Sequence, residues 1–140
     1  MSICRHSIIK IRAVKSFEYI WALRHSFEYQ EKIGKKRIHD RVHYLCSLCK
    51  NELSKIPNIK IYTPFDPELS SGFICFNIEG VKASEIVKKM GEYNIIMGQS
   101  PYKESCARLT PCTYNTEQEI LIACNKLKDI AKELSKNARL

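Results

Sequence analysis

Residues 106–127 read CARLTPCTYNTEQEILIACNKL, and this stretch joins a short apolar run, a polar turn and the start of a long helix. Thr116 and Glu119 have the spacing of a capping box, in which hydroxyl and carboxylate oxygens accept backbone N–H groups at the helix start. Apolar residues then recur at helical spacing, which predicts one buried face, at Ile120, Cys124, Leu127, Ala131 and Leu134. The run before the turn, residues 106–110, is predicted to be a strand.

Arg108 is the candidate binding residue on that strand. A guanidinium is planar and offers parallel N–H donors, so it can hold a carboxylate in one orientation. A position at the end of a strand and next to a helix start suits this role. The alternative interpretation is an ordinary ion pair at the sheet edge, with Glu104 as the nearby acid.

The remaining patterns predict the order helix, helix, strand, strand, helix, strand, strand, helix. The other predicted helices are residues 14–33, 35–55 and 83–92, and the other strands are residues 59–62, 73–78 and 94–97. This order predicts an α/β sandwich, with a small, mostly antiparallel sheet of about four strands and helices on one face.

Composition narrows the classes of protein. The chain of 140 residues has no apolar run long enough to span a membrane, and charge interrupts the N-terminal apolar residues too early for a signal peptide. Its 7 cysteines are odd in number and lack the spacing of a disulfide framework. These features predict a cytoplasmic protein.

All of the net charge of +8 lies in residues 1–60, which hold 13 Lys and Arg against 5 Asp and Glu. A basic half can indicate a nucleic-acid or acidic partner. The basic residues of the second helix, however, alternate with an apolar stripe at helical spacing, which is typical of a helix with one solvated face. The predicted buried stripe is Ile38, Val42, Leu45, Cys49, Leu53 and Ile56. We therefore expect no nucleic-acid partner.

The first predicted helix has an unusually wide apolar arc, formed by Val14, Phe17, Ile20, Trp21, Leu23 and Phe27. An arc of this width indicates an interface. The expected occupant is another domain or a second copy of the chain.

His39, His43, Cys46 and Cys49 share one side of the second helix, which suggests a metal site. One continuous helix cannot surround zinc tetrahedrally, and no second Cys-x-x-Cys completes such a site. Core cysteines and boundary histidines are the preferred interpretation, and we expect no metal.

The motif Arg-x-x-x-x-x-Tyr-Asn-Thr-Glu-x-Glu-Ile, from Arg108 to Ile120, resembles the C-terminal signature of the class V aminotransferase family. Residues 73–87 are similar to the family's small-domain strand, Gly-Val turn and following helix. Residues 33–34 and 57–69 resemble the branch that includes isopenicillin N epimerase-like proteins. The resemblance covers roughly residues 14–134, but only the last third of a family chain.

The resemblance implies the C-terminal small domain of a fold-type-I pyridoxal-phosphate enzyme. Residues 1–34 would be an N-terminal segment with an interdomain-type helix, and residues 35–140 the small domain. Arg108 falls on the family's arginine that binds the α-carboxylate of the amino-acid substrate. The Schiff-base lysine and phosphate-binding groups belong to the family's large domain, and nothing around Lys10 or Lys15 resembles that lysine segment. Pyridoxal phosphate is implied by the family but is not expected to bind this chain alone.

Cysteine desulfurases of this family carry a catalytic cysteine in a loop upstream of the arginine, and Cys106 is the only cysteine in the corresponding region. Its spacing of two residues from Arg108 places it on the strand, and the epimerase-like resemblance also argues against desulfuration. Cys106, Cys112 and Cys124 are therefore interpreted as core or surface thiols.

The predicted function is that of an aminotransferase class V-like C-terminal domain, epimerase-like or desulfurase-like, without catalytic residues of its own. It would be one part of a split enzyme or a truncated copy that is inactive alone. The alternative is a stand-alone basic interaction module that kept the fold without catalysis.

Overall fold

The computed structural model describes residues 17–102 and 105–137. It divides into two compact units, residues 1–38 and residues 39–140, and each is considered by itself. Val14, Lys10, Lys15 and Glu104 lie outside the described residues, so the predictions that fall on them have no structural counterpart.

The described part of the first unit is dominated by helix α2, Phe17–Ile33, which has no buried residue. Its aromatic and aliphatic side chains are exposed, including Phe17 at 77% and Trp21 at 65%. Gly34 ends the helix with a φ of 95°, a left-handed conformation that glycine adopts without a steric penalty. Helix α3 begins at the next residue.

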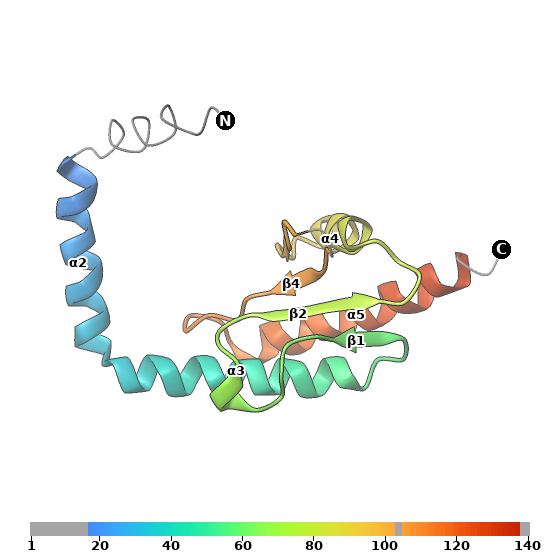
Figure 1. Ribbon diagram of the computed structural model, residues 1–140, viewed down its shortest axis with the longest axis horizontal. Coiled ribbons are helices and arrows are strands. Elements are labelled where there is room, and N and C mark those ends of the chain that lie inside the picture. The colour runs from blue at the N-terminus through green and yellow to red at the C-terminus, as the bar shows by residue number, and fades with distance from the viewer. Residues whose placement is uncertain (1–16, 103–104, 138–140) are drawn as a thin grey trace, which may run out of the picture. The chain divides into compact units, whose positions relative to one another are not determined.

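The second unit is an α/β sandwich, as predicted (Figure 1). This unit begins with most of α3 (Lys35–Ser54). After it come β1 (Ile59–Ile61), a 3₁₀ turn (Pro67–Leu69) and β2 (Ile74–Ile78). Then follow α4, Ala83–Glu92, β3, Gly98–Gln99, β4, Ala107–Leu109, and α5, Glu117–Asn137. The strand order is β1-β2-β4-β3, and each neighbouring pair is antiparallel. None of the helices in the described residues has the length and apolar character needed to cross a membrane.

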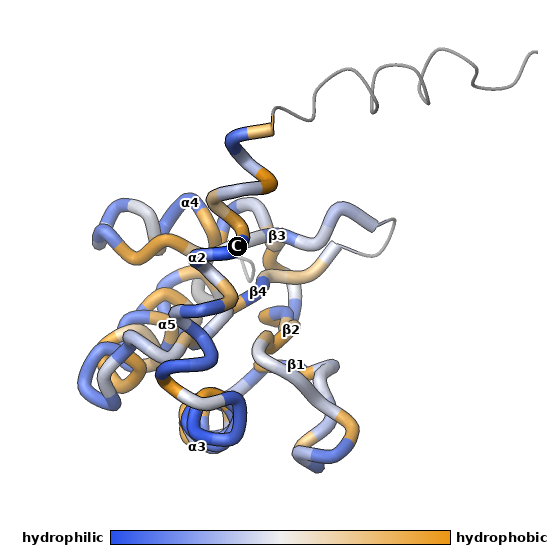
Figure 2. The backbone as a smooth tube through the Cα atoms, turned by 90° about the vertical axis from the view of Figure 1, so that its left-hand side faces the viewer, coloured by the Kyte–Doolittle hydropathy of each residue, from blue (hydrophilic) through white to orange (hydrophobic). Residues whose placement is uncertain are grey.

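The core lies between the sheet and helices α3, α4 and α5, which line the same side of it (Figure 2). Alternation along β2 explains this, because Ile74, Phe76 and Ile78 are buried while Cys75 and Asn77 between them are only partly buried. The predicted helix stripes face the same core, with Leu45, Cys49 and Leu53 from α3 and Ile120, Cys124 and Leu127 from α5.

The predicted strand at residues 94–97 is wrong, and strand β3 lies just after it, at Gly98–Gln99. Asn94 has a φ of 60°, which is left-handed, and the N–H of Ile95 donates to the carbonyl of Met90 at 3.1 Å. Together these form a helix C-cap that ends α4. The apolar residues after Asn94 therefore belong to the cap and the connection to β3.

The predicted capping box at the start of α5 is confirmed. The backbone N–H of Thr116 donates to Oε2 of Glu119 at 2.8 Å, and the N–H of Glu119 donates to Oγ1 of Thr116 at 3.2 Å. Arg41 of α3 also pairs with Glu117, in the first turn of α5. This ion pair links α3 to α5, which cover the same face of the sheet.

Candidate functional site

The candidate site is the open face of the sheet, the side opposite the three helices. Cross-strand register places Lys60 opposite Asn77, and Cys75 opposite Arg108. Because successive residues of a strand point to opposite faces, these four side chains share the face that carries no core residue. Arg108 is central, since β4 lies between β2 and β3.

The Arg108 side chain extends over β3 at Gly98, which is its partner in the ladder. A Cβ atom added to Gly98 would lie 3.3 Å from both Nε and Nη2 of Arg108. A Cβ at this position would be in tight contact with the guanidinium, which would have to shift by a few tenths of an ångström. Sequence reasoning missed Gly98, because only the register reveals which residue faces Arg108.

Nε of Arg108 is buried and has no hydrogen-bond partner. A buried donor without a partner is rare and costs about 1–3 kcal/mol, so it calls for an explanation. No carboxylate in the described part of the chain forms an ion pair with Arg108. The side chain as a whole is only partly buried, so this cation is available to a ligand.

Two thiols lie beside Arg108. Cys75 faces it directly across the ladder, and Cys106 precedes it by two residues and points to the same side. Burial first, and then a hydrogen bond with the Cys106 thiol, raise the pKa of Cys75, while the charge of Arg108 acts in the opposite direction.

Asn77 holds the beginning of β4 in place. Its side-chain Nδ2 donates to the carbonyl of Ser105 at 3.2 Å, and its Oδ1 accepts from the N–H of Ala107 at 3.4 Å. The carbonyl of Cys106 accepts the N–H of Ser100 at 2.8 Å. The backbone of Cys106 is therefore tied to both neighbouring segments.

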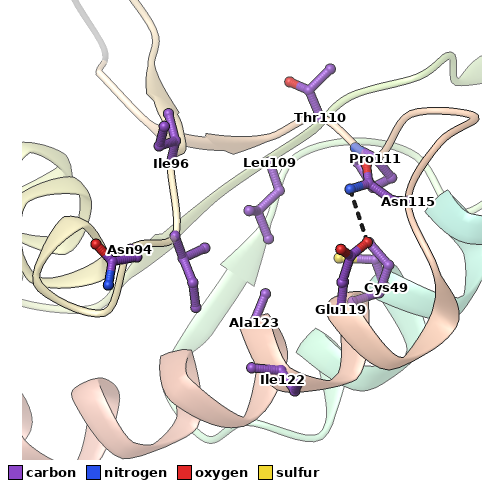
Figure 3. Close-up of a pocket in the computed structure, with 12 residues that line it drawn as sticks. Cys49, Asn94, Ile96, Leu109, Thr110, Pro111, Asn115, Glu119, Ile122 and Ala123 are labelled. Atoms are coloured by element: carbon purple, nitrogen blue, oxygen red, sulfur yellow. Dashed lines mark hydrogen bonds between the residues drawn. The ribbon is translucent and has the colours of Figure 1, made fainter.

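A separate groove of about 290 Å³ lies on the helix side of the sheet (Figure 3). Leu109 of β4, Ala123 of α5 and the Cys49 thiol of α3 line it, and at its rim Asn115 donates to Glu119. Leu109 and Arg108 are consecutive in one strand, so they point to opposite faces. The groove is not part of the Arg108 site.

Comparison with known protein families identifies the family of this chain. The family described as aminotransferase class-V matches residues 10–122, which is most of the chain. The chain belongs to the class V aminotransferase family. No curated protein matched the sequence.

Solved structures of this family's cysteine desulfurases share the fold. The apo cysteine desulfurase of Thermococcus onnurineus NA1 superposes with a TM-score of 0.71 at 18% identity, over 76% of this chain and 29% of that one. The cysteine desulfurase CsdA of Escherichia coli gives 0.65 at 22% identity, over 76% and 28%. A NifS-like protein gives 0.60 at 18% identity, over 69% and 29%. The chain thus spans less than a third of these relatives' length.

Pyridoxal phosphate, the cofactor of the class V aminotransferases, needs an available lysine amine and a cradle for its phosphate. Lys50 is the buried lysine of the described chain, but its ammonium donates to the carbonyls of Pro64 and Phe65 and to Oγ of Ser70. These three hydrogen bonds hold the loop of residues 64–70 and occupy the ammonium. Lys50 is therefore not available to form a Schiff base with pyridoxal phosphate.

The Cys-x-x-Cys pair of α3 faces inward. Cys46 and Cys49 are 2% and 1% exposed, so both belong to the core. His39 and His43 stack on each other, with ring centroids 4.0 Å apart. Within residues 17–102 and 105–137, no three His, Cys, Asp or Glu side chains gather as metal ligands would.

Proposed function

We propose that this chain is the substrate-carboxylate-binding part of a class V aminotransferase-family enzyme, with Arg108 as the residue that binds the α-carboxylate of an amino acid. A second polypeptide would supply the large domain and pyridoxal phosphate. The chain would contribute no group that reacts covalently with substrate. Its role would be to orient the substrate and to form one wall of the active site.

The position of Arg108 on the open face, with Nε left without a hydrogen-bond partner among the described residues, carries this proposal. Nε of Arg108 has no hydrogen-bond partner, and Gly98 gives the guanidinium room to lie flat on the sheet. A carboxylate bound to this fork would supply the acceptor that the protein itself does not. Lysine would be a poor replacement, because it presents a point charge rather than a planar pair of donors.

The length of the chain and the character of α2 support a missing partner. The desulfurases it resembles are more than twice as long, since 76% of this chain covers only 29% and 28% of theirs. Helix α2 exposes Phe17, Ile20 and Trp21, each by more than half of its surface. A large domain that covers this helix would remove that apolar surface from water.

Among the chemistries of the family, we favour an epimerase-like reaction over desulfuration. A desulfurase needs a cysteine that can reach the substrate from a loop. Here the carbonyl of Cys106 accepts a hydrogen bond from the N–H of Ser100, and the next residue, Ala107, begins β4. The thiol lies on the sheet beside Cys75, and its backbone is held on both sides.

The decisive experiment is purification of the tagged full-length chain from its native cells. We would identify co-purifying proteins by mass spectrometry and record the absorbance of bound pyridoxal phosphate. The proposal predicts a stoichiometric partner that carries the cofactor chromophore. Recovery of the chain alone and without chromophore would contradict it and would favour the stand-alone interaction module.

The role of Arg108 is then tested in the assembled enzyme. Arg108→Ala should weaken amino-acid binding at least about tenfold, because a charged hydrogen-bonded pair contributes about 1.5–3 kcal/mol. Lys60→Ala is the matched control, since it removes a cation from the same face while leaving Arg108 intact. Equal effects of the two substitutions would point to general charge rather than to a carboxylate fork.

A further inference from the structure

The open face brings together two cysteines that are far apart in sequence. Cys75 lies in β2 and pairs with Arg108 of β4, and Cys106 lies two residues before Arg108. The Asn77 side chain hydrogen-bonds to the backbone of Ser105 and Ala107, on either side of Cys106. The alignment of β2 with the chain around β4 therefore continues to the residues just before β4. Cys75 and Cys106 are therefore diagonal neighbours on one face of an antiparallel pair.

Exposure distinguishes this pair from the other close thiols. Cys75 and Cys106 are both partly exposed, and they are near enough for Cys106 to contribute to the raised pKa of Cys75. Cys49 and Cys124, with sulfur atoms 3.8 Å apart, are both buried between α3 and α5. A hydrogen bond to Cys124 together with burial raises the pKa of Cys49 well above the usual thiol range. Among these pairs, the one on the open face can meet an oxidant from solution.

We propose that Cys75 and Cys106 form a reversible disulfide on reaction with a low-molecular-weight disulfide such as glutathione disulfide. One cysteine thiolate attacks the small disulfide, forming a mixed disulfide and releasing one thiol. The second cysteine attacks the protein sulfur of that mixed disulfide and releases the other thiol. Two protein thiols and one small disulfide thus become one protein disulfide and two small thiols, so atoms and electrons balance.

Geometry explains why this bond would be easily reversed. A disulfide holds its Cβ atoms about 3.8 Å apart, whereas diagonal neighbours in a sheet start farther apart. Bond formation must therefore pull Cys106 toward β2, at the residue just before β4 begins. A disulfide formed under such strain has a raised reduction potential and is readily reduced.

The location makes the pair a control point for the site. Cys75 lies opposite Arg108, so a bond that shifts Cys106 also moves the strand that carries the guanidinium. On the proposed function, which this consequence requires, oxidation would change the affinity for the substrate carboxylate. Formation of the disulfide itself does not depend on that function.

The test treats the folded, full-length chain with glutathione disulfide, then alkylates the remaining thiols and maps the cysteine peptides by mass spectrometry. The expected product is a cross-link between the peptides of Cys75 and Cys106 that a small thiol reductant reverses. Cys49 and Cys124 should stay reduced, because neither is accessible in the folded state. This measurement requires no variant, partner or cofactor.

Variants then test the mechanism. Cys75→Ser should leave Cys106 as a stable mixed disulfide with glutathione, because the second thiol is absent. Cys112→Ser, which removes a partly exposed cysteine elsewhere, should leave the cross-link unchanged. A wild-type protein that carries only glutathione adducts, or cross-links these cysteines only after denaturation, would overturn the proposal. If the cross-link forms as expected but the reduced, assembled enzyme does not bind the carboxylate, the proposed function alone is contradicted.

Discussion

At the scale of single residues, the site depends on a contact between the long side chain of Arg108 and the backbone of Gly98. Arg108 lies close against β3 at Gly98, where an added Cβ would be 3.3 Å from Nε and Nη2, and Nε is buried without a hydrogen-bond partner. The arrangement sacrifices some stability, since an unsatisfied donor is costly.

The first prediction concerns this contact. Gly98→Ala should displace the guanidinium of Arg108 by a few tenths of an ångström, because the new Cβ would lie 3.3 Å from two of its nitrogens. Displacement exposes Nε, so its N–H should exchange faster with water, as measured by nitrogen NMR of arginine side chains. Gly91→Ala is the control, because a Cβ there meets nothing within 4 Å. An unchanged exchange rate in Gly98→Ala would show that Gly98 does not cover this nitrogen.

The second prediction concerns Lys50, which is 2% exposed. Its ammonium donates to the carbonyl of Pro64 at 2.8 Å, to that of Phe65 at 3.1 Å and to Oγ of Ser70 at 3.0 Å. Lys50→Met keeps the apolar stem but leaves the loop carbonyls unpaired, so urea unfolding should show a loss of about 3 kcal/mol. Lys55→Met, at an exposed position just after the end of the same helix, should change stability by less than about 0.5 kcal/mol. Similar losses for both would argue against a buried anchor.

At the scale of secondary-structure elements, helix starts and ends decide where the site residues lie. The left-handed Asn94 ends α4 and delays the next strand to Gly98, which is the residue that faces Arg108. The capping box starts α5 soon after β4.

The third prediction tests the cap of α5. Thr116→Ala removes the hydroxyl that accepts the N–H of Glu119, and should reduce the free energy of unfolding by about 1 kcal/mol. Thr113→Ala, in the preceding turn, lacks that contact and should be nearly neutral. Chemical denaturation of both variants measures the difference, and equal midpoints would contradict the role of Thr116.

The fourth prediction concerns acid stability. A hydrogen bond from the Thr116 backbone and another from the Asn115 side chain lower the pKa of Glu119 in the folded protein. The stabilisation is therefore complete above the pKa of the unfolded chain and is lost as the pH falls through the lower, folded pKa. Below about pH 4.3, the ordinary glutamate value, wild-type melting temperature should fall more steeply than that of Glu119→Gln. Parallel curves would contradict a lowered pKa at this position.

At the scale of the whole molecule, burial is concentrated in the second unit. The sheet and three helices there enclose the core, whereas α2 has no buried residue. The apolar side chains of α2 are exposed, including Phe17, Ile20 and Trp21.

The fifth prediction compares these two kinds of apolar residue. Phe76→Ala, at a fully buried position, should reduce stability by about 3–5 kcal/mol. Phe17→Ser together with Ile20→Ser should leave the melting temperature nearly unchanged but lower the binding of a hydrophobic dye, because both side chains are exposed. A large thermal destabilisation by the α2 substitutions would show that this chain covers the helix in solution.

Sequence alone determined the features that depend on neighbouring residues. Helical spacing identified the buried stripes of α3 and α5, Thr116 and Glu119 marked a helix start, and the order of elements predicted the α/β sandwich. These signals are local, because capping and periodicity involve residues within a few positions of one another. Arg108 could be singled out by its type and motif, and its role stays a prediction.

Tertiary structure decided which residues surround Arg108. Gly98, Cys75 and the guanidinium come from three strands, and their meeting depends on cross-strand register. Register is set by how all the strands bury their apolar faces together, so no short stretch contains it. For the same reason, the dithiol pair of Cys75 and Cys106 became visible only once β2 and β4 were aligned.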